Sequence, residues 1–208
     1  MRVLLVHNHY QQPGGEDQVF RNEGALLEAE GHRVIRFTLR NDAVDAMAPL
    51  VVARAAFWNG DTYRGLRALI RAERPDVAHF HNTFPLVSPA AYYAARAEGV
   101  AVVQTLHNYR LLCVSATMFR DGRPCETCLG RSPWPGVLHA CYRHSRASSG
   151  VTAGMLVAHR LLGTWRHKVD RYIALTEFAR DKFASGGLPA ERIAVKPNFM
   201  ADPGPPAG

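Results

Sequence analysis

Short apolar runs alternate with amphipathic stretches along most of this chain. Six such runs predict strands, at Arg2–His7, Arg33–Leu39, Asp76–Phe80, Ala101–Leu106, Arg171–Leu175 and Arg192–Lys196. Between them apolar residues recur at helical spacing, as they do at Val19, Phe20, Leu26 and Leu27. Strands that alternate with helices predict an α/β fold, in which a parallel sheet is covered by helices on both faces.

The predicted helices have recognisable beginnings and ends. The first is expected over Glu16–Glu30, with Gly31 as its C-terminal glycine. The others are expected from an Asp61 cap through Ile70, from a Ser88 cap to Ala97, over Ser148–Lys168 and from a Thr176 cap to Ser185, with a weakly helical segment at 43–58. Residues 108–145 are rich in cysteine, proline and glycine and are expected to be irregular.

Polar side chains gather where the predicted strands end. In parallel sheets, ligands bind beyond the carboxyl ends of the strands. The strand-end residues are His7, Asn8, His9, His79, His81, Asn82, His107, Asn108, Thr176, Glu177 and Asn198. A single histidine in such a place more often makes a structural hydrogen bond than a ligand contact. Four of the ten histidines, His7, His9, His81 and His107, fall at this one edge, however, and their convergence predicts a binding site.

The loop after the first strand indicates a ligand without naming it. It contains Gly14-Gly15 and leads into a helix that opens with Glu16 and Asp17. A helix start presents N–H groups and a partial positive charge, and glycines let a ligand approach the backbone and permit positive φ. The pattern matches neither the dinucleotide fingerprint nor the phosphate loop that ends in Gly-Lys-Ser/Thr. A polar or anionic ligand is therefore expected here.

Charge and length narrow the class of protein. The 208 residues suffice for one large domain or two small ones, and the net charge is +7. An anionic surface or substrate is a more consistent partner than nucleic acid, because no nucleic-acid motif is present. No apolar run approaches the ~20 residues that cross a bilayer. The first strand is too short to be the apolar core of a signal peptide, so a cytoplasmic location is expected.

The four cysteines are confined to one segment. They are spaced C-x11-C-x2-C-x12-C, at Cys113, Cys125, Cys128 and Cys141. Four cysteines that include a C-x2-C pair match a structural tetrahedral zinc site, with no position left open for water. Two alternatives remain: four reduced thiols, or a disulfide such as Cys125–Cys128 or Cys113–Cys141.

The stretch after the cysteines combines basic and apolar side chains. Its basic members are His139, Arg143, His144, Arg146, Arg160, Arg166, His167 and Lys168. Its apolar members are Trp134, Leu138, Met155, Leu156, Leu161, Leu162 and Trp165. Such a pattern is compatible with peripheral contact with the inner membrane face. A helix packed on the sheet with an ordinary charged outer face explains it more simply.

Several motifs together resemble a known family. These are the opening R-V-L-L-V, the Gly14-Gly15 loop, and the segments Glu30–Val34, Asp76–Asn82, Thr105–Tyr109, Asp170–Phe178 and Val195–Phe199. In this order and spacing they resemble the N-terminal domain of family 4 glycosyltransferases, over essentially the whole chain. The resemblance implies a Rossmann-like domain of the GT-B fold and a retaining sugar transfer from a nucleotide-sugar. It also implies that catalysis needs no metal.

The resemblance gives roles to residues at the predicted edge. His107 would contact the transferred sugar near the reacting carbon and is the expected catalytic residue. Gly14 and Gly15 would lie against the donor diphosphate and the acceptor. His81 and Asn82 would hold acceptor hydroxyls. The full substrate-binding set expected is Gly14, Gly15, Glu16, His81, Asn82, Asn108 and Asn198, with Asn198 at the crossing to a second domain.

The donor-binding half of the family does not occur in this chain. Residues 1–199 are expected to form the acceptor-side domain, with a cysteine-containing insertion at about 109–145 and a flexible tail or linker at 200–208. The nucleotide pocket, with its E-x7-E motif, would lie in a C-terminal domain of the same or a separate chain. The chain is therefore expected to bind a glycan or lipid-linked acceptor and to be inactive alone. The alternatives are a non-catalytic carbohydrate- or partner-binding module and, less favoured, another Rossmann-like nucleotide binder.

Overall fold

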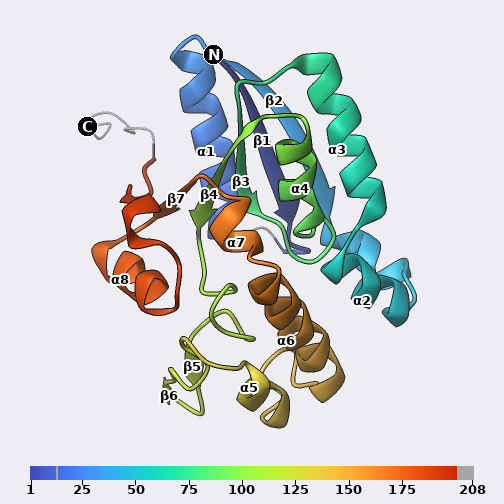
Figure 1. Ribbon diagram of the computed structural model, residues 1–208, viewed down its shortest axis with the longest axis vertical. Helices are drawn as coiled ribbons and strands as arrows, with labels where there is room; N and C mark the ends of the chain where they lie inside the picture. Colours follow the sequence, from blue (N-terminus) through green and yellow to red (C-terminus); the bar gives the residue numbers. More distant parts are fainter. Residues whose placement is uncertain (13, 201–208) are drawn as a thin grey trace, which may run out of the picture.

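A computed structural model describes residues 1–12 and 14–200 of the chain. Its centre is a six-stranded parallel sheet in the order β2-β1-β3-β4-β7-β8 (Figure 1). The strands are β1 Arg2–His9, β2 Arg33–Arg40, β3 Val77–Asn82, β4 Ala101–Leu106, β7 Arg171–Ala174 and β8 Ile193–Val195. The predicted α/β architecture and all six predicted strands are confirmed, with ends that differ by at most two residues.

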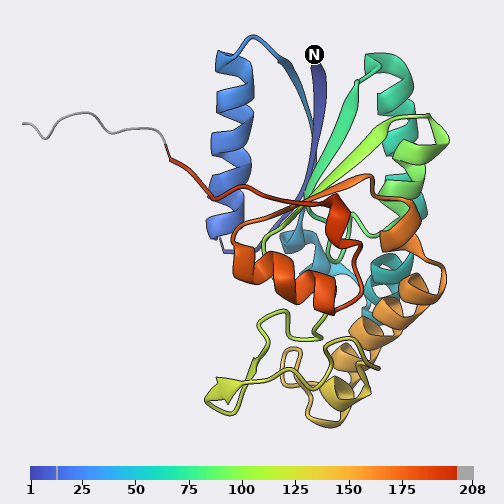
Figure 2. The same cartoon turned by 60° about the vertical axis from the view of Figure 1, so that its left-hand side comes forward.

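Helices cover the sheet on both sides. They are α1 Gly15–Ala29, α2 Pro49–Phe57, α3 Gly60–Glu73, α4 Ala90–Ala97, α5 Trp134–Leu138, α6 Arg146–Leu161, α7 Thr164–His167 and α8 Glu177–Ser185, with short 3-10 turns at η1 Asn41–Ala46 and η2 Ala190–Arg192. Figure 2 shows α1 on one face, with α3 and α4 side by side on the other. Within the described ranges, none of these helices is long and apolar enough to cross a membrane.

The order of the strands reverses between β1 and β3, and the place beyond the carboxyl ends of these two strands is called the crevice below. The chain runs from β1 to β2 on one side and then returns to β3 on the other, so α1 and α3 lie on opposite faces. In such sheets the crevice at the reversal point is where ligands bind. A bulge lies at this point, because Val6 pairs with Phe80 whereas His7 pairs with Asn82. His81 is the unpaired residue, and bulges beside sites re-aim such side chains.

The larger part of the core lies between the sheet and the α3–α4 layer. It contains Leu4 and Val6 of β1, Phe80 of β3 and Tyr92 of α4, all with at most 1% exposure. The face under α1 has a smaller apolar cluster, built on Val3, Leu5 and Phe20. The carboxyl-terminal half of that face is polar, and it holds the histidines described below.

Two predicted helix caps and one predicted continuous helix are wrong. Asn59, not Asp61, caps α3, since its side chain accepts the N–H groups of Asp61 and Thr62 at 3.0 and 3.2 Å. Pro89 occupies the N-cap position of α4, one residue after Ser88. The helix expected over 148–168 is two helices, because Gly163 takes a left-handed backbone (φ +64°) between α6 and α7.

The cysteine-containing insertion lies beyond the carboxyl ends of the strands (Figure 1). As predicted, it has little regular structure: the two-residue strands β5 Phe119–Arg120 and β6 Arg123–Pro124, and the single-turn α5. The predicted tail at 200–208 falls, apart from Met200, outside the described residues.

Candidate functional site

The strand-end histidines lie on one face of the sheet, beneath α1. Successive side chains of a strand point to opposite faces, so His79 and His81 share a face while Phe80 points to α4. The ring of His81 stacks on that of His107, with centroids 5.2 Å apart, and lies 6.2 Å from the ring of His7. Three strands therefore bring their histidines together, as the sequence predicts.

His79, His81 and His107 form a row, since the ring of His81 lies next to each of the other two rings. Glu23 of α1 faces this row. Its buried carboxylate lies 3.8 Å from His79 Nδ1 and 3.6 Å from His81 Nε2. Lys196, which follows β8, brings its Nζ to 3.4 Å from Glu23 Oε1. Burial raises the pKa of Glu23, and Lys196 offsets only part of that rise. The Oε2 of Glu23 and the Nε2 of His81 have no hydrogen-bond partner among the described residues.

The histidines of this row are neutral at pH 7. Burial lowers the pKa of His79 to about 4 and that of His107 to about 3, and it lowers the pKa of His81 well below its usual range. His81 Nδ1 and His107 Nε2 are 3.0 Å apart, so one neutral ring donates a hydrogen bond to the other. The Nδ1 of half-buried His107 has no hydrogen-bond partner in the described part of the chain, so it is free to bond a ligand.

Asp17, in the first turn of α1, centres a second polar cluster. Its Oδ1 accepts hydrogen bonds from His7 Nε2 and His9 Nδ1, both at 2.8 Å, and its Oδ2 accepts the Gly14 N–H at 2.7 Å. Burial alone would raise the pKa of Asp17, but these hydrogen bonds lower it below its usual value. Asp17 is therefore an ionised carboxylate that holds the loop between β1 and α1.

Glu16 connects the start of α1 to the residue after His107. Its Oε1 accepts a 2.6 Å hydrogen bond from Asn108 Nδ2, while its Oε2 is buried without a partner among the described residues. The Tyr10 hydroxyl accepts a longer bond, of 3.4 Å, from the same amide. Burial raises the pKa of Glu16. Two predicted substrate-binding residues, Glu16 and Asn108, are thus in direct contact.

Gly14 and Gly15 stand at the start of α1, and neither uses the positive φ that glycine permits. Gly14 is the N-cap with an extended backbone (φ −121°), and the positive-φ glycines of the described chain lie elsewhere. Asp17 causes this, because its carboxylate holds the Gly14 N–H and fixes an extended entry into the helix. A Cβ on Gly15 would meet no atom within 4 Å. The surface above the helix start is therefore open.

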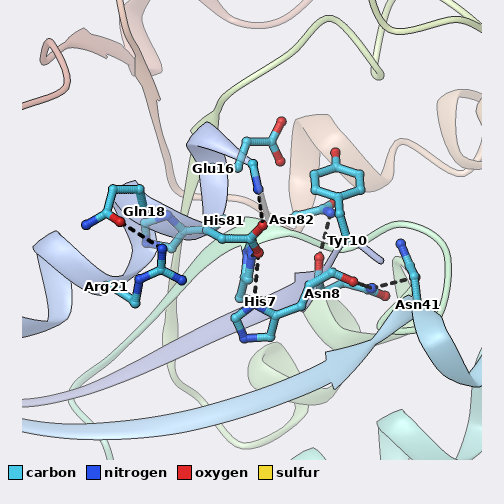
Figure 3. A network of polar contacts seen from close by, with 12 residues as sticks. His7, Asn8, Tyr10, Glu16, Gln18, Arg21, Asn41, His81 and Asn82 are labelled. Atoms are coloured by element: carbon cyan, nitrogen blue, oxygen red, sulfur yellow. Dashed lines mark hydrogen bonds and ion pairs between the residues drawn. The ribbon is translucent and has the colours of Figure 1, made fainter. Parts of the chain in front are cut away.

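Asn82 and Asn8 join β1 and β3 at the crevice. Asn82 Nδ2 donates to the Asn8 carbonyl at 2.8 Å, and its Oδ1 accepts the Phe84 N–H at 3.0 Å. Figure 3 shows Asn8 between Asn82 and Asn41. The Nδ2 of Asn8 donates to the Oδ1 of Asn41 at 2.7 Å. Asn82 therefore holds the backbone, and its contact with an acceptor hydroxyl stays a prediction. Asn198 lies exposed beyond β8.

A groove of about 310 Å³ opens beside these strand ends. It is lined by η1, α2, the Phe84–Pro85 loop after β3 and the start of α6. Tyr142 gives it an aromatic wall, and Arg143, Asp45 and Asn41 give it polar ones. Its size and mixed lining suit a sugar-like ligand. The sequence did not predict it, because its walls come from segments far apart in the chain.

The four cysteines meet at a separate small cavity. All of them line one space of about 20 Å³, and all are free thiols in the described structure. The apolar stretch that follows them divides in two. Met155, Leu156 and Trp165 are buried in the core, whereas Trp134, Leu138, Leu161 and Leu162 are exposed.

Two groups near the crevice have the residue types of a metal site. The ligand atoms of His7, His9 and Asp17, and those of Glu23, His79 and His81, lie within 4.8 Å of one another. The first group is already bonded through one carboxylate oxygen. The second is next to the Lys196 ammonium, which disfavours a further cation.

Asp17, Glu23 and Lys196 belong to the site but were not among the predicted site residues. For Glu23 a signal exists, since it follows Phe20 by three positions and precedes Leu27 by four. A carboxylate thus occupies the apolar face of a helix, where it needs a polar partner. Lys196 carries no such signal, because its contact joins the end of the chain to α1.

Comparisons with known proteins agree with this geometry. The sequence model of Glycosyltransferase Family 4 matches residues 13–201. The fold is similar to a putative UDP-N-acetylglucosamine 2-epimerase from Listeria monocytogenes, at 14% identity and a TM-score of 0.50, over 92% of this chain and 43% of that one. It is also similar to the UDP-N-acetylglucosamine 2-epimerase from Rickettsia bellii, at 14% identity and a TM-score of 0.50, over 95% of this chain and 45% of that one. No curated protein sequence matches significantly.

A lipopolysaccharide outer core galactosyltransferase, WaaB, has 12% identity and a TM-score of 0.48, over 94% of this chain and 45% of that one. This chain thus spans less than half the length of each of these structures.

Proposed function

This chain belongs to glycosyltransferase family 4, and we propose that it is the acceptor-binding half of a retaining hexosyltransferase. The sugar would pass from a nucleotide-sugar to a glycan or a lipid-linked acceptor. A place in bacterial-type polysaccharide assembly is consistent with such an acceptor. The epimerases of similar fold are, by name, enzymes of a UDP-sugar, which fits a nucleotide-sugar donor.

One observation carries the proposal: a neutral imidazole with one unbonded nitrogen lies at the crevice, beside an open helix start. His107 Nδ1 has no hydrogen-bond partner among the described residues, and His107 Nε2 is bonded to His81. Since the pKa of His107 is about 3, the ring stays neutral and can hydrogen-bond a sugar hydroxyl. A neutral ring also avoids an extra positive charge next to an oxocarbenium-like sugar.

The start of α1 supplies the complementary electrostatics. A leaving nucleoside diphosphate gains negative charge in the transition state, and preorganised backbone dipoles stabilise such charge. The open surface at Gly15 admits a ligand to this helix N-terminus. Backbone dipoles can do this without a metal ion.

The groove next to Asn41 and Tyr142 is our candidate for the acceptor site. It adjoins the crevice through the Asn8–Asn41 contact. Family membership implies a C-terminal donor-binding domain across the crevice, in the same or a separate chain. Without it, donor and acceptor are not held together, and the chain is expected to bind weakly and to turn over little substrate.

A lipid-linked acceptor would place the protein at the cytoplasmic face of a membrane. The exposed apolar side chains Trp134 and Leu138 of α5 would contact the lipid, with Arg143 nearby in sequence. Co-sedimentation with anionic vesicles at low salt tests this, with Trp134→Ala as the weakened variant. No binding by the wild-type chain rejects membrane contact but leaves the transferase proposal in place.

Resonance assignment of the histidine side chains and glycine amides tests the site. Methyl glycosides of glucose, galactose, mannose and N-acetylglucosamine are titrated into the chain. At least one is expected to shift His107 and the Gly14 or Gly15 amide, but not His32, which lies at the opposite edge of the sheet. Shifts that avoid the crevice, or no shift with any glycoside, would argue against the proposal. Binding at the crevice by a full-length protein that transfers no sugar would favour a non-catalytic module.

A further inference from the structure

The cavity between the four cysteines has the size of one ion. Its volume is about 20 Å³, whereas a single water needs roughly 10–15 Å³ of such space. Most of its other walls are apolar, among them Leu112, Val114, Met118 and Leu129. So small a room suits one metal ion better than an organic ligand. Four thiols around so small a space have no other evident ligand.

The segment around the cavity has a strained backbone and little regular structure to hold it in place. Six of the eight non-glycine residues with positive φ in the described chain belong to it: Ala116, Met118, Asp121, Ala140, Arg143 and His144. Such backbone is strained and persists only where its surroundings fix it. The regular structure available is two strands of two residues and one helical turn. A metal that cross-links the segment at four points would hold this backbone.

Polar neighbours of the sulfur atoms match those of a thiolate site. Ser115 Oγ lies 3.2 Å from Cys113 Sγ, and Thr127 Oγ1 lies 3.4 Å from Cys125 Sγ. Arg120 lines the same cavity. Hydroxyl donors and a nearby cation stabilise the two net negative charges of a zinc ion bound by four thiolates.

We propose that the four cysteines bind one structural zinc ion. Among the described residues, no three of the sulfur atoms lie mutually within 4.8 Å, so binding must draw them inward. A tetrahedral site with sulfur at about 2.3 Å from zinc requires this contraction. No oxidant or reductant is involved: each thiol loses a proton as its sulfur binds the metal.

The ion would also support the groove, a consequence that rests on the proposed function. Cys141 is followed directly by Tyr142 and Arg143, which line the groove. The Arg110 guanidinium lies 4.8 Å from the centre of the Tyr142 ring and 4.7 Å from that of Phe84, and Arg110 also donates to the Val114 carbonyl. The zinc site thereby connects to the groove wall through both its last ligand and Arg110.

Metal analysis of the chain purified under reducing conditions tests the site directly. One zinc per chain is expected, and Co²⁺ in its place should give the sulfur-to-cobalt charge-transfer absorption of a tetrathiolate site. Cys128→Ser should lose the zinc, while the matched control Ser132→Ala in the same segment should keep it, because Ser132 is exposed and does not line the cavity.

Four titratable thiols in a folded, metal-free chain would overturn the proposal, and so would a disulfide. If Cys128→Ser does not fold, the zinc content and cobalt spectrum of the wild type decide alone. Both results are independent of sugar binding. A failure here therefore leaves the transferase proposal standing, and a failure of the glycoside titration leaves the zinc site standing.

Discussion

Acid should destabilise this protein through the buried histidines, and His79 offers the cleanest test. Its ring is 8% exposed, and its Nε2 is bonded to Thr105 Oγ1 at 2.7 Å. It also faces Glu23, Lys196 and the ring of His81. The perturbation is His79→Gln, since glutamine can still donate to the Thr105 hydroxyl but does not titrate.

The magnitude follows from linkage. The pKa of His79 is 6.5 in the unfolded chain and about 4 in the folded one. Above pH 6.5 both states are neutral, and no stability is lost. Below it the unfolded chain takes up a proton that the folded chain does not, so stability falls until the pH reaches about 4. Between about pH 7.5 and pH 5 this proton uptake lowers the free energy of unfolding by about 2 kcal/mol.

Urea unfolding of both proteins at the two pH values, followed by circular dichroism, measures the effect. Glu16 and Glu23 act in the opposite direction, because burial raises their pKa values and the folded chain gains stability as they take up protons. Both carboxylates are present in both proteins, so the contribution of Glu16 cancels in the difference and that of Glu23, which faces His79, cancels in large part. On going from the higher to the lower pH, the free energy of unfolding of the wild type should therefore fall by about 2 kcal/mol more than that of His79→Gln. Equal losses would show that His79 is not held neutral in the folded state.

Three further outcomes are expected. Asn59→Ala should lower the free energy of unfolding by about 1–2 kcal/mol, because Asn59 caps α3 and also donates to the Leu86 carbonyl at 2.6 Å; an unchanged urea midpoint would contradict the capping role. Gly136→Ala should lower the melting temperature measured by calorimetry, since its Cβ would lie 2.7 Å from a methyl group of Val114 beside the cysteine cavity. An unchanged melting temperature would contradict this close packing. Removing bound metal with a chelator should lower the melting temperature and increase proteolysis within residues 109–145, and unchanged cleavage would show that no metal supports the insertion.

The sheet and the site edge could be predicted because they depend on local pattern. Apolar runs gave the strands, and the rule that parallel strands end at one edge brought His7, His81 and His107 together. The helix ends were less predictable. Asn59 competes with Asp61 for the cap of α3, and their spacing alone does not decide between them.

Contacts between distant segments could not be predicted. Lys196 reaches Glu23 across 173 positions of the chain, and nothing near either residue in the sequence indicates the pairing. Gly14 shows a second limit. Its residue type permits positive φ, but the Asp17 carboxylate selects an extended backbone. The meeting of the cysteines followed from their spacing, whereas the groove walls, contributed by several loops, had no local signal.

Turnover by the protein expressed from its complete reading frame tests the central claim most directly. Nucleoside diphosphate release is measured with a panel of nucleotide-sugars and methyl glycosides, for the wild type, His107→Ala and the distant control His32→Ala. Loss of a positioned hydrogen-bonding group typically costs about 10²-fold or more in kcat. We expect such a loss for His107→Ala, with His32→Ala close to the wild type. Wild-type turnover that His107→Ala leaves unchanged would contradict the account.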